Sequence, residues 1–327
     1  MIQPIAQALV DLSDIRDAQS RLNGITVRTR LIKFDHTDPV RQLYLKPENQ
    51  QPIGAFKLRG AYNKIASLPD AERKRGVISY SSGNHAQGVA YAARALGVKA
   101  VIVMPNNAPQ IKRDATAKLG AEIVLVGPGS EERKNKAEEL AARHGYAIVP
   151  PYNDEHIIAG QGTIGLEILE DLPEVETVLL PVGGGGLISG VATAIKLSKP
   201  SVKVIGVEPE LAADAQASLR SGSLVQLSAE QVSRTIADGL RTQSIGAINF
   251  EHIRKYVDGI ITVSEDEIRQ AMKALAGNPE TVAEPSGAVA TAGFLFHRDE
   301  LPKTALTVAI ISGGNIEPGM LKQLRCS

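Results

Sequence analysis

Short apolar runs alternate with amphipathic stretches along most of this chain, and this alternation constrains the fold more than any other feature. From residue 77 onward, VISYS, VKAVIVM and AEIVLVG are each followed by a stretch of helical periodicity. A second series comes after PPYND, with the runs VETVLLPV, VKVIGVEP and TALTVAIIS. Continuous apolar strands separated by helices are typical of parallel β-α-β units covered on both faces. The sequence therefore predicts an α/β protein with two lobes, each a mostly parallel sheet flanked by helices.

The boundary between the two series is marked by Pro150-Pro151, the clearest punctuation in the chain. We place a small domain at residues 77–152 and a large domain at residues 1–76 and 153–327. No low-complexity linker separates the lobes, so the sequence marks neither boundary sharply.

Charge and cysteine content exclude several classes of protein. Lys and Arg number 36, as do Asp and Glu, so no basic excess favours nucleic acid or an anionic membrane. Cys326 is the single cysteine, so neither an intrachain disulfide nor a cysteine metal cluster can form. No stretch approaches the roughly 20 apolar residues of a membrane span, and the first residues lack a secretory leader pattern. We expect a cytoplasmic protein that binds a small molecule, and neither nucleic acid nor a membrane.

Four consecutive glycines follow the run VETVLLPV, immediately before an expected helix. Glycines let backbone N–H groups crowd around an oxyanion, and a helix N-terminus adds partial positive charge. The stretch lacks the third glycine of G-x-G-x-x-G and the G-K-[ST] ending of a nucleotide P-loop. We interpret residues 183–186 as a phosphate site of another kind, and a tight strand-to-helix turn is the alternative.

Two more strand ends carry polar groups. The loop after VISYS, SSGNHAQG, concentrates hydroxyl, amide and imidazole groups of the kind that bind a small carboxylate or a cofactor hydroxyl. A lone histidine is more often a structural hydrogen-bonding group than a catalyst, so His85 is given no proton-transfer role. At the end of TALTVAIIS, Ser312 presents a neutral hydroxyl that can meet a ring nitrogen.

Lys57 stands between Phe56 and Arg59 in the stretch GAFKLRGAYN. Three interpretations remain open from these residues alone. Lys57 is a solvated lysine on an amphipathic helix, or it forms an anion patch with Arg59, or it is a nucleophilic amine that forms a Schiff base with a carbonyl cofactor.

Together, the Phe-Lys pair, the Ser-Gly-Asn loop, the four glycines and the strand-end serine resemble the fold-type II pyridoxal phosphate enzymes. Within that group the chain is similar to the threonine/serine dehydratase and serine racemase family over nearly its whole length. The resemblance implies a fold like that of the tryptophan synthase β subunit. It also implies cofactor contacts: an imine from Lys57, ring packing by Phe56, a bond from Asn84 to the ring hydroxyl, phosphate binding by Gly183, Gly184, Gly185 and Gly186, and a contact from Ser312 to the pyridine nitrogen, with Glu284 nearby.

The same resemblance places the substrate carboxylate against Ser81, Ser82, Asn84 and His85. Ser82 would face the cofactor from the side opposite Lys57 and act as a second catalytic group. Arg133 in SEERK matches a position that reaches the substrate, and a solvated charged face is the alternative for that stretch.

A cation site is also implied by the resemblance. In VEPELAAD, Glu208, the carbonyl of Ala212 and Asp214 have the spacing of the family's Mg²⁺ or Ca²⁺ site, and oxygen ligands suit such hard cations. An ordinary acidic loop is the alternative. Two departures from the family are visible: Ala55 replaces a usual serine before the Phe-Lys pair, and Thr29-Arg30 replaces a usual Thr-Pro.

The implied reaction is elimination of water from a β-hydroxy amino acid such as L-threonine or L-serine, which gives a 2-oxo acid and ammonia. Racemisation of serine, alone or beside dehydration, and dehydration of 3-hydroxyaspartate are the nearest alternatives. A non-catalytic sensor of a phosphate ligand is an alternative of another class, but it leaves the Phe-Lys pair unexplained. We expect a homodimer or homotetramer.

Overall fold

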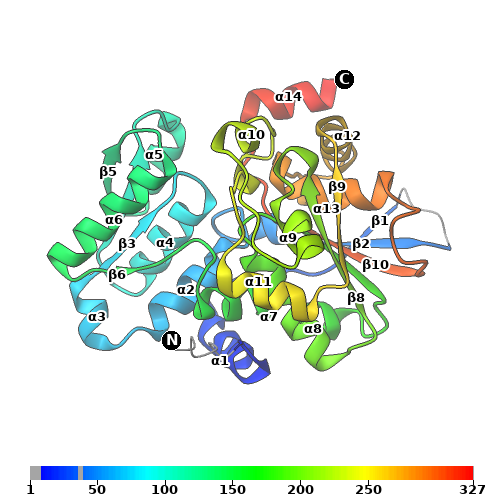
Figure 1. The fold of residues 1–327 in the computed structure, drawn as a ribbon, viewed down its shortest axis with the longest axis horizontal. Helices are drawn as coiled ribbons and strands as arrows, with labels where there is room; N and C mark the ends of the chain where they lie inside the picture. Colours follow the sequence, from blue (N-terminus) through cyan, green and yellow to red (C-terminus); the bar gives the residue numbers. More distant parts are fainter. Residues whose placement is uncertain (1–8, 36–39, 327) are drawn as a thin grey trace.

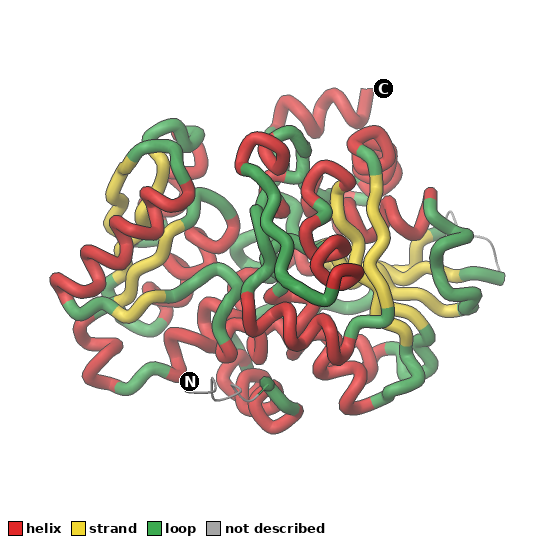
Figure 2. The backbone as a smooth tube through the Cα atoms, viewed as in Figure 1, coloured by secondary structure: helices red, strands yellow, loops and turns green. Residues whose placement is uncertain are grey.

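The computed structural model describes residues 9–35 and 40–326 and divides them between two lobes. The smaller lobe lies at the left of Figure 1 and the larger lobe at the right. Each lobe has its own sheet with helices around it, as Figure 2 shows. The predicted α/β architecture with two mostly parallel sheets is confirmed.

The smaller lobe contains a four-stranded parallel sheet in the order β5-β4-β3-β6. Its strands are β3 (Val77–Tyr80), β4 (Ala100–Pro105), β5 (Glu122–Val126) and β6 (Ala147–Ile148). The helices of this lobe are α3 (Asp70–Arg75), α4 (Asn84–Ala95), α5 (Gln110–Lys118) and α6 (Ser130–His144).

The larger lobe contains a six-stranded sheet in the order β1-β2-β10-β7-β8-β9. Only the β1-β2 pair in this sheet is antiparallel among the described residues. Its strands are β1 (Ile32–Phe34), β2 (Gln42–Pro47), β7 (Thr177–Pro181), β8 (Lys203–Pro209), β9 (Gly259–Val263) and β10 (Leu306–Ile311). The helices are α1 (Leu12–Leu22), α7 (Glu155–Asp171), α8 (Gly186–Ser198), α9 (Asp214–Ser221), α10 (Ala229–Ser233), α11 (Ala247–Tyr256), α12 (Glu265–Leu275), α13 (Pro285–Phe296) and α14 (Pro318–Cys326).

Both faces of the large sheet are buried, and this explains its continuous apolar strands. Successive side chains of a strand point to opposite faces. In β10, Val308 and Ile310 join the core under α7, α8 and α11, whereas Ala309 and Ile311 join the core under α12 and α13. All four side chains are fully buried. A strand of this kind needs apolar residues along most of its length, and β10 has them at every position except Thr307, which is buried.

Helix α2 (Lys57–Ser67) connects the two lobes. It packs against α4 in the smaller lobe and against α7 in the larger lobe. Its Ala61 and Ile65 share a core with Val89 of α4 and Ile157 of α7. Because α2 contacts both lobes, the domain boundary drawn at residue 76 stays a prediction.

Helix lengths and composition bear on membrane insertion. Among the described residues, no helix combines the length and the apolar character needed to cross a membrane.

Candidate active site

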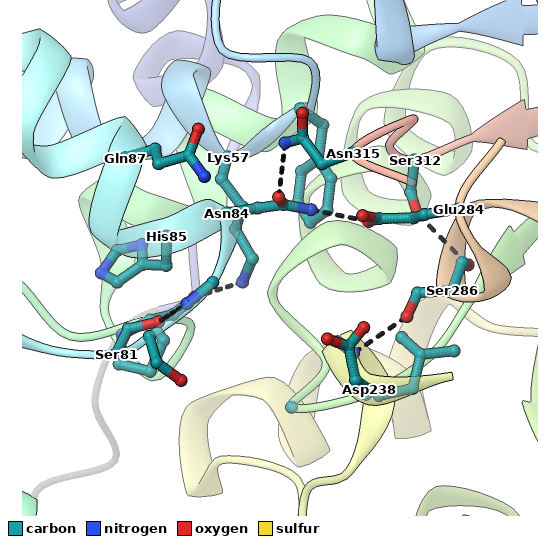
Figure 3. A pocket seen from close by; sticks show the side chains of 18 of the residues that line it. Lys57, Ser81, Asn84, His85, Gln87, Asp238, Glu284, Ser286, Ser312 and Asn315 are labelled. Carbon is teal, nitrogen blue, oxygen red and sulfur yellow. Dashed lines mark hydrogen bonds between the residues drawn. The ribbon is translucent and has the colours of Figure 1, made fainter. Parts of the chain in front are cut away.

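A cavity of about 420 Å³ lies between the lobes, where β3, β7 and β10 end. The residues that line it come from loops and helix starts far apart in the sequence: Lys57, residues 81–85, glycines 183–186 and Ser312. Figure 3 shows several of these side chains pointing toward one another. The structure therefore brings the sequence motifs together in one site.

The start of α2 is fixed against the end of β10. Ala55 forms an isolated antiparallel bridge with Gly313, and the N–H of Phe56 donates to the carbonyl of Ser312 at 3.1 Å. Ala55, where the family usually has serine, is fully buried. These contacts hold Lys57, the first residue of the helix, at the edge of the cavity.

The Lys57 amine is half-buried and donates a hydrogen bond to the carbonyl of Pro151 at 2.8 Å. Its Nζ lies 5.2 Å from the centroid of the Phe56 ring. Burial lowers the pKa of Lys57 to about 8, because the charged form is poorly solvated there. An amine with this pKa is partly unprotonated near neutral pH and can act as a nucleophile or a base. The interpretation of Lys57 as a solvated surface lysine is wrong.

Arg59 points away from the cavity into a buried ion network. It is only 1% exposed and donates to Glu48 Oε2 at 2.8 Å and to Glu167 Oε1 at 2.7 Å. Lys46 completes the network through a 2.6 Å contact with Glu167 Oε2. The interpretation in which Lys57 and Arg59 form one anion patch is therefore wrong, and Arg59 anchors α2 instead.

The four glycines form the turn between β7 and α8. Gly185 has φ +92°, which favours glycine, and a Cβ at this position would lie 2.8 Å from the Cβ of Asn249. A Cβ at Gly184 would collide with the ring of Tyr152. No side chain caps the first turn of α8. Its free N–H groups and the helix dipole therefore make an anion cradle that larger residues would fill.

The Ser-Gly-Asn loop leads into α4, which also starts at the cavity. Gly83 is its N-cap residue, and no side chain caps this helix. Its first backbone N–H groups, including that of His85, are thus available for a carboxylate. Ser81 and Ser82 are half-buried and line the cavity beside them. Ser81 Oγ accepts a hydrogen bond from the N–H of Gly83 at 3.3 Å.

The His85 side chain has a structural contact. Its Nε2 lies 3.0 Å from the carbonyl of Val149, so this nitrogen carries the proton and donates it. Burial, together with the charge of Lys57, lowers the pKa of His85 to about 3. The imidazole is neutral at physiological pH and holds the loop against the strand β6 region. The predicted contact of His85 with a carboxylate would come from its backbone.

Asn84 is at the centre of a hydrogen-bond chain (Figure 3). Its Nδ2 donates to Glu284 Oε1 at 2.6 Å, and its Oδ1 accepts from Asn315 Nδ2 at 2.7 Å. Burial raises the pKa of Glu284 to about 7, and the charge of Asp238 adds to this rise. Glu284 thus titrates near neutral pH beside the residue predicted to contact the ring hydroxyl.

Ser312 is buried at the end of β10 and lies at the cavity wall. Its Oγ donates to the carbonyl of Ser286 at a long 3.4 Å. Ser286 Oγ in turn accepts from the N–H of Gly239 at 2.9 Å. The weak bond leaves the Ser312 hydroxyl able to turn toward a ring nitrogen.

Arg133, on α6, also lines the cavity and is half-buried, whereas the neighbouring Glu132 and Lys134 are exposed. Burial lowers its pKa somewhat, yet a guanidinium remains charged. The alternative interpretation of this stretch as a solvated charged face fits these neighbours but not Arg133. At the same cavity, Lys112 of α5 and Asp238 form an ion pair of 2.7 Å between the lobes.

The predicted cation ligands lie at the end of β8. Glu208 and Asp214 are fully buried, and the buried Ala212 stands between them in the chain. Neither carboxylate oxygen of Asp214 has a side-chain partner, and only the nearby backbone N–H of Ile245 opposes the rise that burial causes in its pKa. Among the residues described, no group of three or more His, Cys, Asp or Glu side chains could hold a metal ion. A cation here would rest on two carboxylates, carbonyl oxygens and water, a set that suits Mg²⁺ or Ca²⁺.

Comparison with known proteins identifies the family of this chain. Residues 21–313 match the family model described as pyridoxal-phosphate dependent enzyme. The chain belongs to this family. L-threonine ammonia-lyase of Thermotoga maritima is 46% identical over 318 residues, which cover 97% of this chain and 78% of the relative. L-threo-3-hydroxyaspartate ammonia-lyase of Saccharomyces cerevisiae is 42% identical over 306 residues, with 93% of each chain covered. The solved structure of maize serine racemase superposes with a TM-score of 0.92 at 36% identity, and the match covers 97% of each chain.

The residues of this cavity fit pyridoxal phosphate. The glycine turn supplies backbone N–H groups where side chains would clash, and the Lys57 amine and the Ser312 hydroxyl lie in the same cavity. Tyr152, whose ring covers Gly184, is not among the site residues predicted from the sequence. Its only signal is a position directly after Pro150-Pro151, where the chain crosses between the lobes.

Proposed function

We propose that the protein is a pyridoxal-phosphate dependent ammonia-lyase that dehydrates a β-hydroxy amino acid to a 2-oxo acid and ammonia. The observation that carries the proposal is the convergence of an amine of lowered pKa, a glycine cradle and the uncapped start of α4 in one cavity. The identity of 46% to an L-threonine ammonia-lyase over nearly the whole chain supports the same reaction. A non-catalytic phosphate sensor would have no use for the Lys57 amine.

Each part of the site has a role in this reaction. When bound, pyridoxal phosphate supplies an electron sink that makes the Cα proton of the substrate acidic. The glycine turn and the start of α8 bind the phosphate, and the start of α4 binds the substrate carboxylate. Lys57 Nζ is the base for the Cα proton, because its pKa of about 8 lies near the operating pH. Phe56 packs beside that amine and limits the access of water.

A substrate panel tests the proposal. Purified protein with added pyridoxal phosphate is incubated with L-threonine, L-serine, D-serine and 3-hydroxyaspartate, and 2-oxo acid formation and enantiomer ratio are followed together. We expect 2-oxo acid from L-threonine or L-serine. Formation of D-serine without any 2-oxo acid would instead assign the chain as a racemase. A homo-oligomeric assembly and a cytoplasmic location stay predictions that rest on the sequence.

Arg133 supports a second candidate substrate, 3-hydroxyaspartate. A guanidinium at the cavity wall can bind the second carboxylate of this substrate with two hydrogen bonds. The yeast relative that acts on L-threo-3-hydroxyaspartate supports the same candidate.

Arg133→Gln is expected to raise KM for 3-hydroxyaspartate by about 10- to 100-fold, the usual value of hydrogen bonds to a charged group. The KM for L-threonine should change less than about threefold, since threonine has no second carboxylate. Steady-state kinetics on both substrates measure this, with the exposed Lys134→Gln as the matched control. Equal changes on both substrates would contradict a specific role for Arg133.

We also propose a divalent cation at Glu208 and Asp214. Burial raises the pKa of Glu208 well above its usual value, and the nearby charge of Asp214 adds to the rise. Two buried acids whose charges repel each other are stabilised by a cation that neutralises them.

Mg²⁺ is expected to raise the melting temperature by a few degrees, because a ligand that binds only the folded state stabilises it by about 2.7 kcal/mol at 100 times its Kd. Asp214→Asn should remove this shift. Asp258→Asn is the control, since Asp258 pairs with Lys196 and Lys203 and should leave the shift unchanged. A wild-type melting temperature that changes with neither Mg²⁺ nor a chelator would show that no cation binds.

The absorption spectrum of the bound cofactor is expected to change with a midpoint near pH 7. Glu284, with a pKa of about 7, keeps its proton below the midpoint and becomes a carboxylate that accepts from Asn84 above it. Asp238 and Lys112 are the other charges that face Glu284. In Glu284→Gln the midpoint should vanish, whereas the exposed Glu280→Gln should retain it. A midpoint that survives in Glu284→Gln would assign the titration to another group.

A further inference from the structure

Arg59 is held by two carboxylates at once. Its Nε and Nη2 donate to Glu48 Oε2 and Oε1, both at 2.8 Å. Its Nη1 and Nη2 also donate to Glu167, to Oε1 at 2.7 Å and to Oε2 at 3.0 Å. Glu48 begins the short helix η1 (Glu48–Gln50) and Glu167 lies on α7, so both acids belong to the larger lobe. Two paired contacts to different elements fix the plane of the guanidinium.

The network around Arg59 is buried and balanced in charge. Lys46 joins it through Glu167, and the hydroxyl of Thr163 on α7 accepts from Arg59 Nη1 at 3.1 Å. The side chains of Lys46, Glu48, Arg59 and Glu167 are at most 8% exposed. Buried ion pairs of this kind often add little to stability, because the cost of desolvation offsets their attraction. Their directional contacts do fix one geometry, and the element that they hold is α2.

The backbones of α2 and α7 touch next to Arg59. A Cβ at Gly160 of α7 would lie 2.7 Å from the carbonyl oxygen of Arg59 and 2.7 Å from the Cα of Gly60. On α4, a Cβ at Gly88 would lie 3.2 Å from the carbonyl oxygen of Lys57. These glycine contacts bring the helices together without interlocking side chains. At the crossing with α7, the side chain that resists rotation of α2 about its axis is therefore Arg59.

Rotation of α2 would move the Lys57 amine. Lys57 is two residues before Arg59, or about 3 Å along the helix axis. Its Nζ donates to the carbonyl of Pro151 at 2.8 Å, at the wall of the cavity. The glycine turn and Ser312 follow β7 and β10 of the larger lobe, the lobe to which Arg59 is tied. A misplacement of about 1 Å in an active site can lower a rate by about 100-fold.

We propose that Arg59, clamped by two carboxylates, is a positioning residue that holds the Lys57 amine in place relative to the glycine turn. Arg59 does so by fixing the rotation of α2 on the larger lobe, which carries both the turn and Ser312. The inference rests on the proposed function, because that function gives the amine its role. It adds a set of residues outside the cavity on which the reactivity of Lys57 depends.

The first measurement follows Lys57 itself and needs no substrate. In protein stripped of cofactor, the rate of pyridoxal phosphate capture, followed by absorbance, depends on the unprotonated fraction of this amine. Burial lowers the pKa of Lys57 to about 8 from an ordinary value of 10.5, so the wild-type capture rate should rise with pH to a midpoint near 8. An amine that is turned out of its buried place regains water, and its midpoint moves toward 10.5.

A charge-balanced double variant separates positioning from stability. Lys46→Met with Glu167→Met removes one cation and one anion, so Arg59 keeps Glu48 as its partner. The melting temperature should change by only a few degrees, since apolar replacements of buried ion pairs are often neutral. We expect the capture midpoint to rise by at least about half a pH unit. For 2-oxo acid formation, kcat should fall about 10- to 100-fold while KM changes less than about threefold.

Two single variants complete the test. Thr163→Val leaves every charge in place but removes one acceptor of Arg59, so it should shift the capture midpoint in the same direction by a smaller amount. Arg28→Met is the matched control, because the ion pairs of Arg28 go to two other acids of α7 and not to Arg59. In this control, the midpoint should stay near 8 and kcat should change less than about twofold.

Each outcome decides for or against the positioning role. A wild-type midpoint and kcat in both the double variant and Thr163→Val would overturn it. A double variant that does not fold would also overturn it, because the network would then be required for stability. A wild-type protein that captures no pyridoxal phosphate would overturn the proposed function as well. If capture occurs and its midpoint shifts as expected but no 2-oxo acid forms, only the ammonia-lyase assignment is contradicted.

Discussion

Lys57→Ala is expected to lose the absorbance of bound cofactor and at least about 1,000-fold of the 2-oxo acid forming activity. The proposed function gives Lys57 two roles that disappear with one side chain. It is the amine that would hold the cofactor, and it is the proposed base for the Cα proton, a role worth about 10²- to 10⁴-fold by itself. The fold should survive, because α2 stays anchored by Arg59 to Glu48 and Glu167.

Two further variants make this result specific. Lys57→Arg keeps a positive charge but supplies no nucleophilic amine, so it should be as inactive as the alanine variant. The exposed Lys74→Ala of α3 should behave like wild type. If Lys57→Ala kept a bound-cofactor spectrum and more than about a tenth of the activity, the amine that carries the chemistry would have to be another one.

Ser82→Ala is expected to abolish interconversion of L- and D-serine and dehydration of D-serine, while a substantial part of L-substrate dehydration remains. Racemisation needs a second acid or base on the face of the substrate opposite Lys57, whereas elimination from the L-enantiomer needs only the Lys57 side. Ser82 is half-buried at the cavity wall, in the loop that leads into α4. The similarity to maize serine racemase supports a test of both activities.

The neighbouring hydroxyl provides the control. Ser81→Ala removes the acceptor for the N–H of Gly83 and should weaken binding of L- and D-serine alike, with KM rising for both. Activities are measured as 2-oxo acid and as enantiomer ratio in the same reaction. Equal losses of L-dehydration and racemisation in Ser82→Ala would make Ser82 a binding residue and leave racemisation without a second base.

The parts of the fold that could be predicted are those whose signal is local. Strands such as β10 are apolar at nearly every position because both faces are buried, and glycine runs at strand ends indicate tight turns. Strand β2 was missed because its sequence, QLYLKP, is interrupted by polar residues. Lys46 is nevertheless fully buried there, since its charge is neutralised by Glu167, 121 positions away.

The same limit applies to the site. Lys57, the Ser-Gly-Asn loop and the glycine turn could be found because each carries its residue pattern within a few positions. The bond from Asn84 to Glu284 spans 200 positions, and the packing of Tyr152 on Gly184 depends on how the chain crosses between the lobes. Such pairs are set by tertiary structure, and a single sequence contains no local sign of them.

The central claim is that this chain uses pyridoxal phosphate at Lys57 to release ammonia from a β-hydroxy amino acid. The most direct test measures 2-oxo acid and ammonia together from cofactor-loaded wild-type protein given L-threonine or L-serine. The account predicts equal molar amounts of both products, loss of both in Lys57→Ala, and dependence on pyridoxal phosphate in protein stripped of cofactor. Protein that stays colourless with pyridoxal phosphate, or that binds it but releases neither product from L-threonine, L-serine or 3-hydroxyaspartate, would contradict it.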